Sequence, residues 1–148
     1  MMTIKHIAPG LDHILYGEEL LSIIMRDSFQ SPSITFPTGD DSTLQFGYLP
    51  HQAGNTIKPH IHKENPRTIV YTHEVLIMKK GKVKVNFYST EKEYVGSEYI
   101  MGGDVILLCG GGHGFEIIEE TIMIEVKQGP YMGVDDKERF VGIEGKQV

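Results

Sequence analysis

The sequence predicts an all-β fold with few helices, built as a single domain. Short apolar or alternating runs recur at intervals of about 8 to 12 residues, with turn-forming residues between them. Runs with the 3.6-residue period of an amphipathic helix are scarce. A chain of 148 residues, 40% of them hydrophobic, is long enough for one core and too short for two. Together these observations predict a β-sandwich or a β-barrel.

The N-terminal part of the chain gives a weak signal followed by a stronger one. We expect residues 1–17 to form an N-terminal arm with one short strand or helical turn, because Pro9, Gly10 and Gly17 interrupt it. Residues 18–26 contain an apolar run that fits the period of either a helix or a strand. Its two β-branched isoleucines favour a strand.

Three more strands are expected before the middle of the chain. A short one is predicted around residues 33–36 in a loop-like stretch, and residues 44–48 alternate apolar and polar positions as a half-buried strand does. The stretch IKPHIH follows at residues 57–62. Pro59 within it suits the start of a strand or an edge strand, because proline donates no ladder hydrogen bond.

A polar loop at residues 63–68 precedes a predicted strand, turn and strand. The first strand ends in EVLIMKK at residues 74–80, and Gly81 marks the turn. In the second strand, residues 82–87, valine and phenylalanine alternate with lysine and asparagine. We therefore expect a hairpin with one face exposed to water.

The last third of the chain contains four more strand-like runs. They lie at residues 98–101, 105–109, 113–118 and 121–128. The tail, residues 132–148, is charged and is expected to be partly extended. The expected barrel core thus spans approximately residues 18–131.

Charge and cysteine content exclude several classes of protein. The net charge of -6 disfavours a nucleic-acid groove, which needs clustered Lys and Arg. Cys109 is the only cysteine, which excludes an internal disulfide framework and fits a reducing compartment. No segment approaches the roughly 20 apolar residues that cross a bilayer, and residues 20–25 are too few for a signal peptide. We therefore expect a soluble, cytoplasmic protein without nucleic-acid or membrane partners.

The most informative stretch carries two histidines followed by an acid in an apolar strand. Successive strand side chains point to opposite faces, so His60 and His62 share one face and Ile61 takes the other. Glu74 opens an apolar strand, where an unpaired buried carboxylate is strongly disfavoured. A cation held by the two histidines would supply the partner. The pattern therefore indicates a metal site.

This spacing resembles the first motif of the cupin superfamily, the small jelly-roll barrels with two metal-site motifs. That motif has Gly, five residues, His-x-His, three or four residues, Glu, six residues and Gly. The matching positions are Gly54, His60, His62, Glu74 and Gly81. Eleven residues separate His62 from Glu74 here, which inserts a loop and makes Glu64 a rival for the acid. We favour Glu74 because its spacing to Gly81 matches the family.

The second cupin motif is matched in part. It has Gly, five residues, Pro-x-Gly, two residues and His. Gly103 and Asp104 stand at its start, and Cys109 occupies the place where proline is usual. Gly111 follows, and His113 comes one residue early. The two motifs occur in the family's order and span residues 54–117.

The resemblance implies a single-domain cupin jelly-roll barrel with a metal held by His60, His62, Glu74 and His113. Three imidazoles and a carboxylate suit a divalent transition metal such as Zn, Mn, Ni or Fe, and differ from an oxygen-only calcium cage. Such a metal could polarise a carbonyl or lower the pKa of a bound water, and the ligand set leaves both open. Glu74 and His113 are accordingly the expected catalytic residues.

Four further polar residues are expected to bind a substrate. They are Arg67, Lys127, Gln128 and Tyr131. Glu125 and Lys127 share one face of the strand at residues 121–128, and inward strand faces line cupin cavities. Arg67 lies in the inserted loop, where a lid would be expected, and could clamp a carboxylate or phosphate. The alternatives are a solvent-exposed edge strand and a surface arginine.

Three other residues are assigned structural roles. His73 should point to the face opposite Glu74, or alternatively line the mouth of the cavity. His51 is expected in a solvated turn. Cys109 fits a small hydrophobic residue better than a nucleophile.

The resemblance implies a metal-dependent enzyme that acts on a small polar molecule. The ending VILLCGGGHGFEIIEETIMIEVKQGPYMG looks like small single-domain cupins associated with surface-polysaccharide synthesis. That implies isomerase or epimerase chemistry on a sugar or sugar derivative. The alternatives are an iron-dependent oxygenase and a non-enzymatic small-ligand-binding cupin. A homodimer is also expected, because exposed sheet edges tend to pair.

Overall fold

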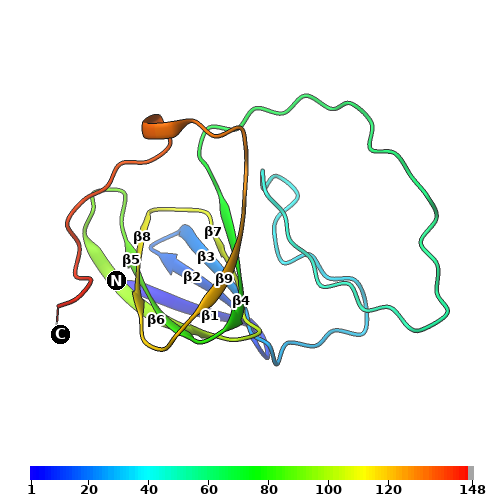
Figure 1. Cartoon of the computed structure of the whole chain (residues 1–148), viewed down its shortest axis with the longest axis horizontal. Coiled ribbons are helices and arrows are strands. Elements are labelled where there is room, and N and C mark those ends of the chain that lie inside the picture. Colours follow the sequence, from blue (N-terminus) through cyan, green and yellow to red (C-terminus); the bar gives the residue numbers. More distant parts are fainter. Residues whose placement is uncertain (147–148) are drawn as a thin grey trace.

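The computed structural model describes residues 1–146 and confirms an all-β fold (Figure 1). Within this range the chain forms nine strands, one short 3-10 helix, η1 (Gly133–Asp135), and no α-helix. The strands are β1 (Met2–Ala8), β2 (Leu11–Tyr16), β3 (Glu19–Met25), β4 (Glu74–Lys80), β5 (Lys82–Tyr88), β6 (Tyr94–Met101), β7 (Val105–Leu108), β8 (Gly112–Ile117) and β9 (Ile122–Lys127).

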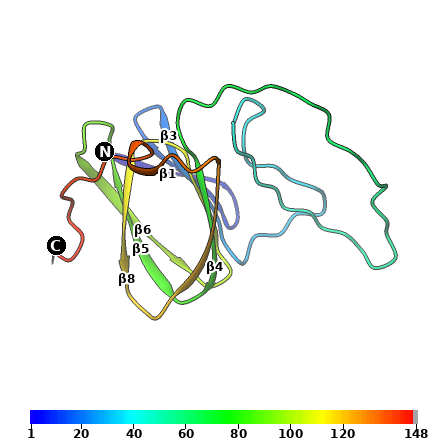
Figure 2. The same ribbon diagram turned by 45° about the horizontal axis from the view of Figure 1, so that its top comes forward.

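The strands form two antiparallel sheets that face one another (Figures 1 and 2). The larger sheet has the order β1-β2-β3-β7-β4-β9 and the smaller one the order β6-β5-β8. Apolar side chains from both sheets form one core between them, with Ile14, Leu21 and Phe87 almost fully buried. Among residues 1–146 no strand ladder joins the two sheets. Closure into a barrel therefore stays a prediction.

β4 alternates as its sequence predicts. Leu76 and Met78 point into the core between the sheets, and Glu74 lies on the same face. Val75 takes the other face and is also buried, whereas Ile77 is 36% exposed. The strand that carries the predicted acid is thus apolar on both faces for most of its length.

The predicted hairpin at Gly81 is wrong in its pairing. β4 pairs with β7 and β9, and β5 pairs with β6 and β8, so the chain crosses from one sheet to the other at Gly81. Gly81 has a φ of 97°, and a Cβ at this position would collide with the backbone of Glu120. The glycine therefore allows a tight crossover between the sheets.

Residues 1–17 are not an arm, which corrects the expected domain boundaries. They form β1 and β2, which extend the larger sheet beyond β3. Met2 and Ile4 alternate with exposed residues and pack against the core. The apolar–polar alternation of β1 is short, because the strand lies half-buried at the sheet edge. In the sequence, the breakers Pro9, Gly10 and Gly17 therefore give a stronger signal than this alternation.

The segment after β3 covers the outer face of the larger sheet. Phe29 and Tyr48 meet edge to face with ring centroids 5.2 Å apart, above a second buried cluster that includes Ile23 and Leu107. The strands expected at residues 33–36 and 44–48 are reduced to one isolated bridge between Thr35 and Tyr48. Their apolar side chains are used for packing instead of for a ladder.

The C-terminal tail packs on the outer face of the smaller sheet. Tyr88 donates a hydrogen bond to Glu144 at 2.8 Å, accepts one from the backbone of Ile143, and stacks edge to face on Phe140. Asn86 also donates to Glu144 and is fully buried. The face of β5 that was expected to be wet is therefore covered by the tail.

The turn before β7 is organised by Asp104, which is 4% exposed. Its carboxylate accepts hydrogen bonds from the backbone N–H groups of Asp27 at 2.9 Å and Met101 at 2.8 Å. The guanidinium of Arg26 lies 3.4 Å away. A buried carboxylate with these partners joins β3 to the turn between β6 and β7.

Within residues 1–146 no helix is long and apolar enough to cross a membrane.

Replacing Asp104 with alanine is expected to destabilise the fold by about 2–3 kcal/mol, because two backbone donors and Arg26 lose a charged acceptor. Urea unfolding followed by circular dichroism measures this difference. Asp41→Ala is the matched control, because Asp41 is exposed, and its effect should stay within about 0.5 kcal/mol. Equal unfolding midpoints for the two variants would contradict the assigned role of Asp104.

Candidate functional site

Glu74 and His113 meet between the two sheets. Glu74 starts β4 in the larger sheet, and His113 lies on β8 in the smaller one. Their Oε2 and Nε2 atoms are 3.2 Å apart, and the side chains are 16% and 28% exposed, respectively. The structure therefore brings together the acid and the last histidine of the predicted site.

A tight turn delivers His113 to this position. Gly111 has a φ of 56°, and a Cβ there would collide with the carbonyl of Tyr88. The turn leads directly into β8, where His113 pairs with Phe87 and faces inward together with Phe115. The histidine thus enters the space between the sheets from the opposite side to Glu74.

The imidazole of His113 lowers the pKa of Glu74. Its hydrogen bond is the main cause, and the charge of a protonated His113 acts in the same direction. Partial burial of the carboxylate raises the pKa and opposes part of this effect. Glu74 is therefore ionised at neutral pH, in the form that binds a cation.

A second group of charged side chains lies beside Glu74 at the end of β9. Lys127 is the cross-strand partner of Glu74, and Glu125 shares its inward face. The Lys127 ammonium lies 3.8 Å from Glu125 and 3.9 Å from Asp136, which comes from the segment after η1. Lys127 thus lies on the inward face of β9, and its charge is only loosely paired.

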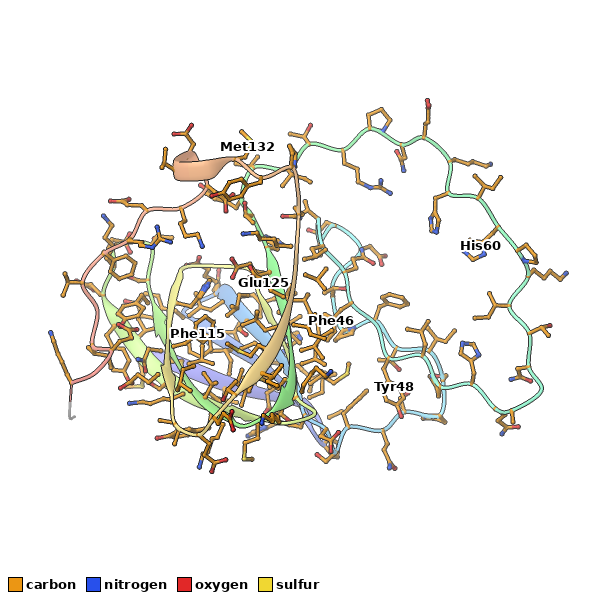
Figure 3. All side chains as sticks on the ribbon, viewed as in Figure 1. Phe46, Tyr48, His60, Phe115, Glu125 and Met132 are labelled. Carbon is orange, nitrogen blue, oxygen red and sulfur yellow. The ribbon has the colours of Figure 1, made fainter. Side chains whose placement is uncertain are left out.

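His60 and His62 lie far from this pair. They belong to residues 51–72, here called the extended segment, in which every residue is exposed. The segment projects away from the sheets, and His60 is well separated from Phe115 and Glu125 (Figure 3). The strand expected at residues 57–62 is absent. Among residues 1–146 no three His, Cys, Asp or Glu side chains of one chain are close enough to hold a metal ion.

The two histidines nevertheless lie side by side as predicted. Their ring centroids are 5.3 Å apart, while Ile61 between them is 93% exposed. The Nδ1 of His60 lies 3.0 Å from the carbonyl oxygen of Lys58. A carbonyl can only accept, so Nδ1–H is the donor, and Nε2 is the ring nitrogen that remains available to a metal.

The base of the extended segment is fixed to β9. Gln128 accepts a hydrogen bond from the backbone N–H of His73 at 2.8 Å and donates to the Thr43 hydroxyl at 3.0 Å. The His73 Nδ1 lies 3.4 Å from the same hydroxyl, and burial lowers the pKa of this imidazole. Gln128, predicted to bind substrate, thus holds two chain segments together in this conformation.

The remaining predicted substrate ligands are on the surface. Arg67 is exposed in the extended segment and donates to the carbonyl of Asn65 at 3.3 Å. Tyr131 follows β9 and is 84% exposed. The structure brings neither residue to Glu74 and His113 by a hydrogen bond or an ion pair among residues 1–146.

Two residues of this site were not selected from the sequence. Glu125 could have been found, because the alternation of β9 places it on the same face as Lys127. Asp136 could not, because its approach to Lys127 depends on the path of the tail after η1. No periodic pattern encodes that path.

Another charged cluster lies in an open hollow of about 590 Å³ on the larger sheet. Asp12 is 8% exposed, and its carboxylate lies 2.6 Å from His6 and 3.9 Å from Arg26. Arg26 offsets the charge of the buried carboxylate, and His6 forms a hydrogen bond with it, as a buried charge in a folded chain requires. A structural role, the pairing of the buried Asp12 carboxylate, therefore accounts for this cluster.

Comparison of the chain with models of protein families, with curated proteins and with solved structures finds no match. The site is therefore interpreted from its own residues and geometry.

Cys109 directly follows β7, at the start of the turn into β8, and its thiol is not activated. Burial raises the pKa of its thiol to about 11, and the nearby Glu19 acts in the same direction. The Sγ lies 3.6 Å from the carbonyl of Leu20. These surroundings fit the small hydrophobic role predicted for Cys109.

The folded protein is expected to react with iodoacetamide at pH 8 on the order of 100-fold more slowly than the same chain in urea. A thiol pKa near 11 leaves about that much less of the reactive thiolate than an ordinary cysteine has. Because Cys109 is the only cysteine, mass spectrometry of the intact chain reports this rate directly. Similar rates in the two states would show that the thiol is accessible and ionisable.

Proposed function

We propose that this chain is a metal-dependent enzyme of the cupin type, with His60, His62, Glu74 and His113 as metal ligands. The contact of 3.2 Å between Glu74 and His113 supports the proposal most strongly. These residues come from different sheets, and each is the predicted ligand of one of the two sequence motifs. An ionised carboxylate and an imidazole in contact are two of the ligands that such a site requires.

The donor set fits a divalent transition metal in its chemistry. Glu74 is held ionised by its surroundings, and the Nδ1–H of His60 donates to the carbonyl oxygen of Lys58, which leaves Nε2 as the ring nitrogen available to a metal. A hydrogen bond from the other nitrogen to a carbonyl is the usual support of a metal-binding histidine. The four residues therefore fit the metal, provided that His60 and His62 reach the pair.

The substrate that we propose is a sugar or sugar derivative with a carbonyl group. A bound divalent metal supplies polarisation of that carbonyl, which acidifies the neighbouring C–H bond. Lys127 carries a loosely paired charge at the mouth of the site and is suited to hold an anionic or hydroxylated group. Glu125 faces inward, its side chain is 44% exposed, and it is not one of the four proposed metal ligands. We assign it the proton transfer between adjacent carbons.

Wild-type protein is expected to bind about one divalent metal ion per chain, and His60→Ala with His62→Ala should lose nearly all of it. Elemental analysis after dialysis against Zn²⁺ or Mn²⁺ provides the measurement. His51→Ala with His73→Ala is the matched control, because it also removes two imidazoles near the ends of the extended segment. Equal metal content in all three proteins would remove the metal site from the proposal.

Metal-loaded protein is expected to exchange solvent deuterium into the carbon beside the carbonyl of a keto- or aldohexose, free or nucleotide-linked, as seen by NMR in D₂O. Glu125→Gln should abolish this exchange and keep the metal, because it removes only the proton acceptor. Oxygen consumption by an iron-loaded sample, without exchange, would instead indicate an oxygenase. Tight sugar binding without exchange or oxygen consumption would indicate a binding protein. Either result contradicts the isomerase.

A further inference from the structure

The extended segment is exposed along its whole length and pairs with no strand among residues 1–146. All of residues 51–72 are exposed, including Ile61, Val70 and Tyr71, whose exposed fractions are 93%, 78% and 78%. Apolar side chains in such numbers are normally covered in the functional state. One end follows Tyr48, which packs on the outer face of the larger sheet, and the other end is held by the Gln128 bond at the end of β9. Among residues 1–146, the hydrogen bonds of the middle of the segment are all internal to it.

The smaller sheet has a vacant place next to the site. β8 pairs with β5 on one side, and among residues 1–146 no strand pairs with its other side. An open edge of this kind presents unpaired N–H and C=O groups to any extended chain. His113 is one of the inward-facing residues of this edge strand. A strand added there would therefore run directly past the predicted metal position.

Strand addition at β8 would satisfy the geometry of the motif. Facing side chains of neighbouring strands have Cβ atoms about 4.5–5.5 Å apart, and residues two apart share a face. One register thus brings both His60 and His62 beside His113 and Glu74. The Ile61 side chain turns to the outer face. The carbonyl of Lys58, which fixes the His60 tautomer, travels with the same segment.

The position of the extended segment indicates whether it would pair with β8 of its own chain or with β8 of a second copy. In both views it leaves the molecule on the side of β4 and β9, whereas β8 lies on the opposite side (Figures 1 and 2). Both of its ends are held on that far side by Thr35, Tyr48 and Gln128. A second copy of the chain can present β8 to it directly. A two-fold axis makes the exchange reciprocal, so each copy gives one segment and receives one.

An apolar strip on β9 and β4 is the second feature that a partner copy would cover. The outward side chains of Ile122, Ile124 and Val126 are 49%, 46% and 47% exposed, next to Ile77 at 36%. β9 and β4 lie on the side of the molecule from which the extended segment departs (Figure 1). A contiguous apolar face of this kind marks an interface between chains.

We propose that the active form is a dimer in which each metal site is completed by the partner subunit. The partner's residues 55–63 add as an edge strand to β8 and place the partner's His60 and the partner's His62 beside His113 and Glu74. This inference rests on the proposed metal site and names the chain that supplies its two missing ligands. It also explains why a single chain brings only two of the four proposed ligands, Glu74 and His113, into contact.

The test uses mixed dimers of two defective full-length chains that carry different affinity tags. One chain carries His60→Ala and His62→Ala, and the other carries Glu74→Gln and His113→Ala. Co-expression and purification by both tags yields the mixed dimer, and circular dichroism checks that each chain is folded. Exchange in trans predicts about one half of the wild-type Zn²⁺ content per chain, because one of the two sites then has all four ligands.

The opposite arrangement is the matched control. A wild-type chain paired with a chain that carries all four substitutions should bind almost no Zn²⁺ if the ligands come from both subunits. Ligands from a single chain predict the reverse for both pairings, and that result overturns the inference while leaving the proposed metal site intact. A monomeric wild-type protein by light scattering also overturns it. Absence of Zn²⁺ from a folded wild-type dimer would refute the metal site itself, and the exchange with it.

Discussion

An ionised carboxylate that points into the space between two apolar sheets must have a partner. Glu74 occupies such a position, and its partner is the imidazole of His113, which lies 3.2 Å away on the facing sheet. Two turns in the surrounding structure bring these side chains together. The Gly81 crossover places β4 and β5 in different sheets, and the Gly111 turn returns β8 to face β4. The loosely paired Lys127 stands next to this pair because β9 is in register with β4.

Two unsatisfied features of the single chain complement each other. The extended segment carries the two histidines and a strand-like sequence, but among residues 1–146 it joins no sheet. β8 is an edge strand of the smaller sheet, and within the same residues no strand pairs with its outer edge. Backbone hydrogen bonding and burial of apolar side chains both favour their union. In the proposed dimer the metal ligands would add a third contribution, because all four ligands come together only where the two chains join. In this account the dimer, the site and the fold depend on one another.

The sequence predicts those parts of the molecule in which local pattern and burial agree. β4 and β7 are continuous apolar runs, and β9 alternates, so their existence follows from period alone. The inward direction of Lys127 does not follow from period, because the alternation of β9 favours burial of the face that carries Ile122, Ile124 and Val126, and these side chains are exposed. The pairing of β4 with β9 instead of β5 does not follow, because long-range pairing is not encoded in the turn at Gly81. The first two strands were missed because their alternation is brief and half-buried. The location of His60 does not follow either, because the pattern at residues 57–62 predicts a strand that is absent from the extended segment.

The most direct test of this account is a crystal structure of the full-length chain grown with Zn²⁺, with anomalous diffraction recorded at the zinc edge. The account predicts one anomalous peak per subunit, bounded by Glu74 and His113 of one chain and by the two histidines of the extended segment of the other. A structure with zinc elsewhere, or with Glu74 still bonded directly to His113 and the extended segment unpaired, would contradict it.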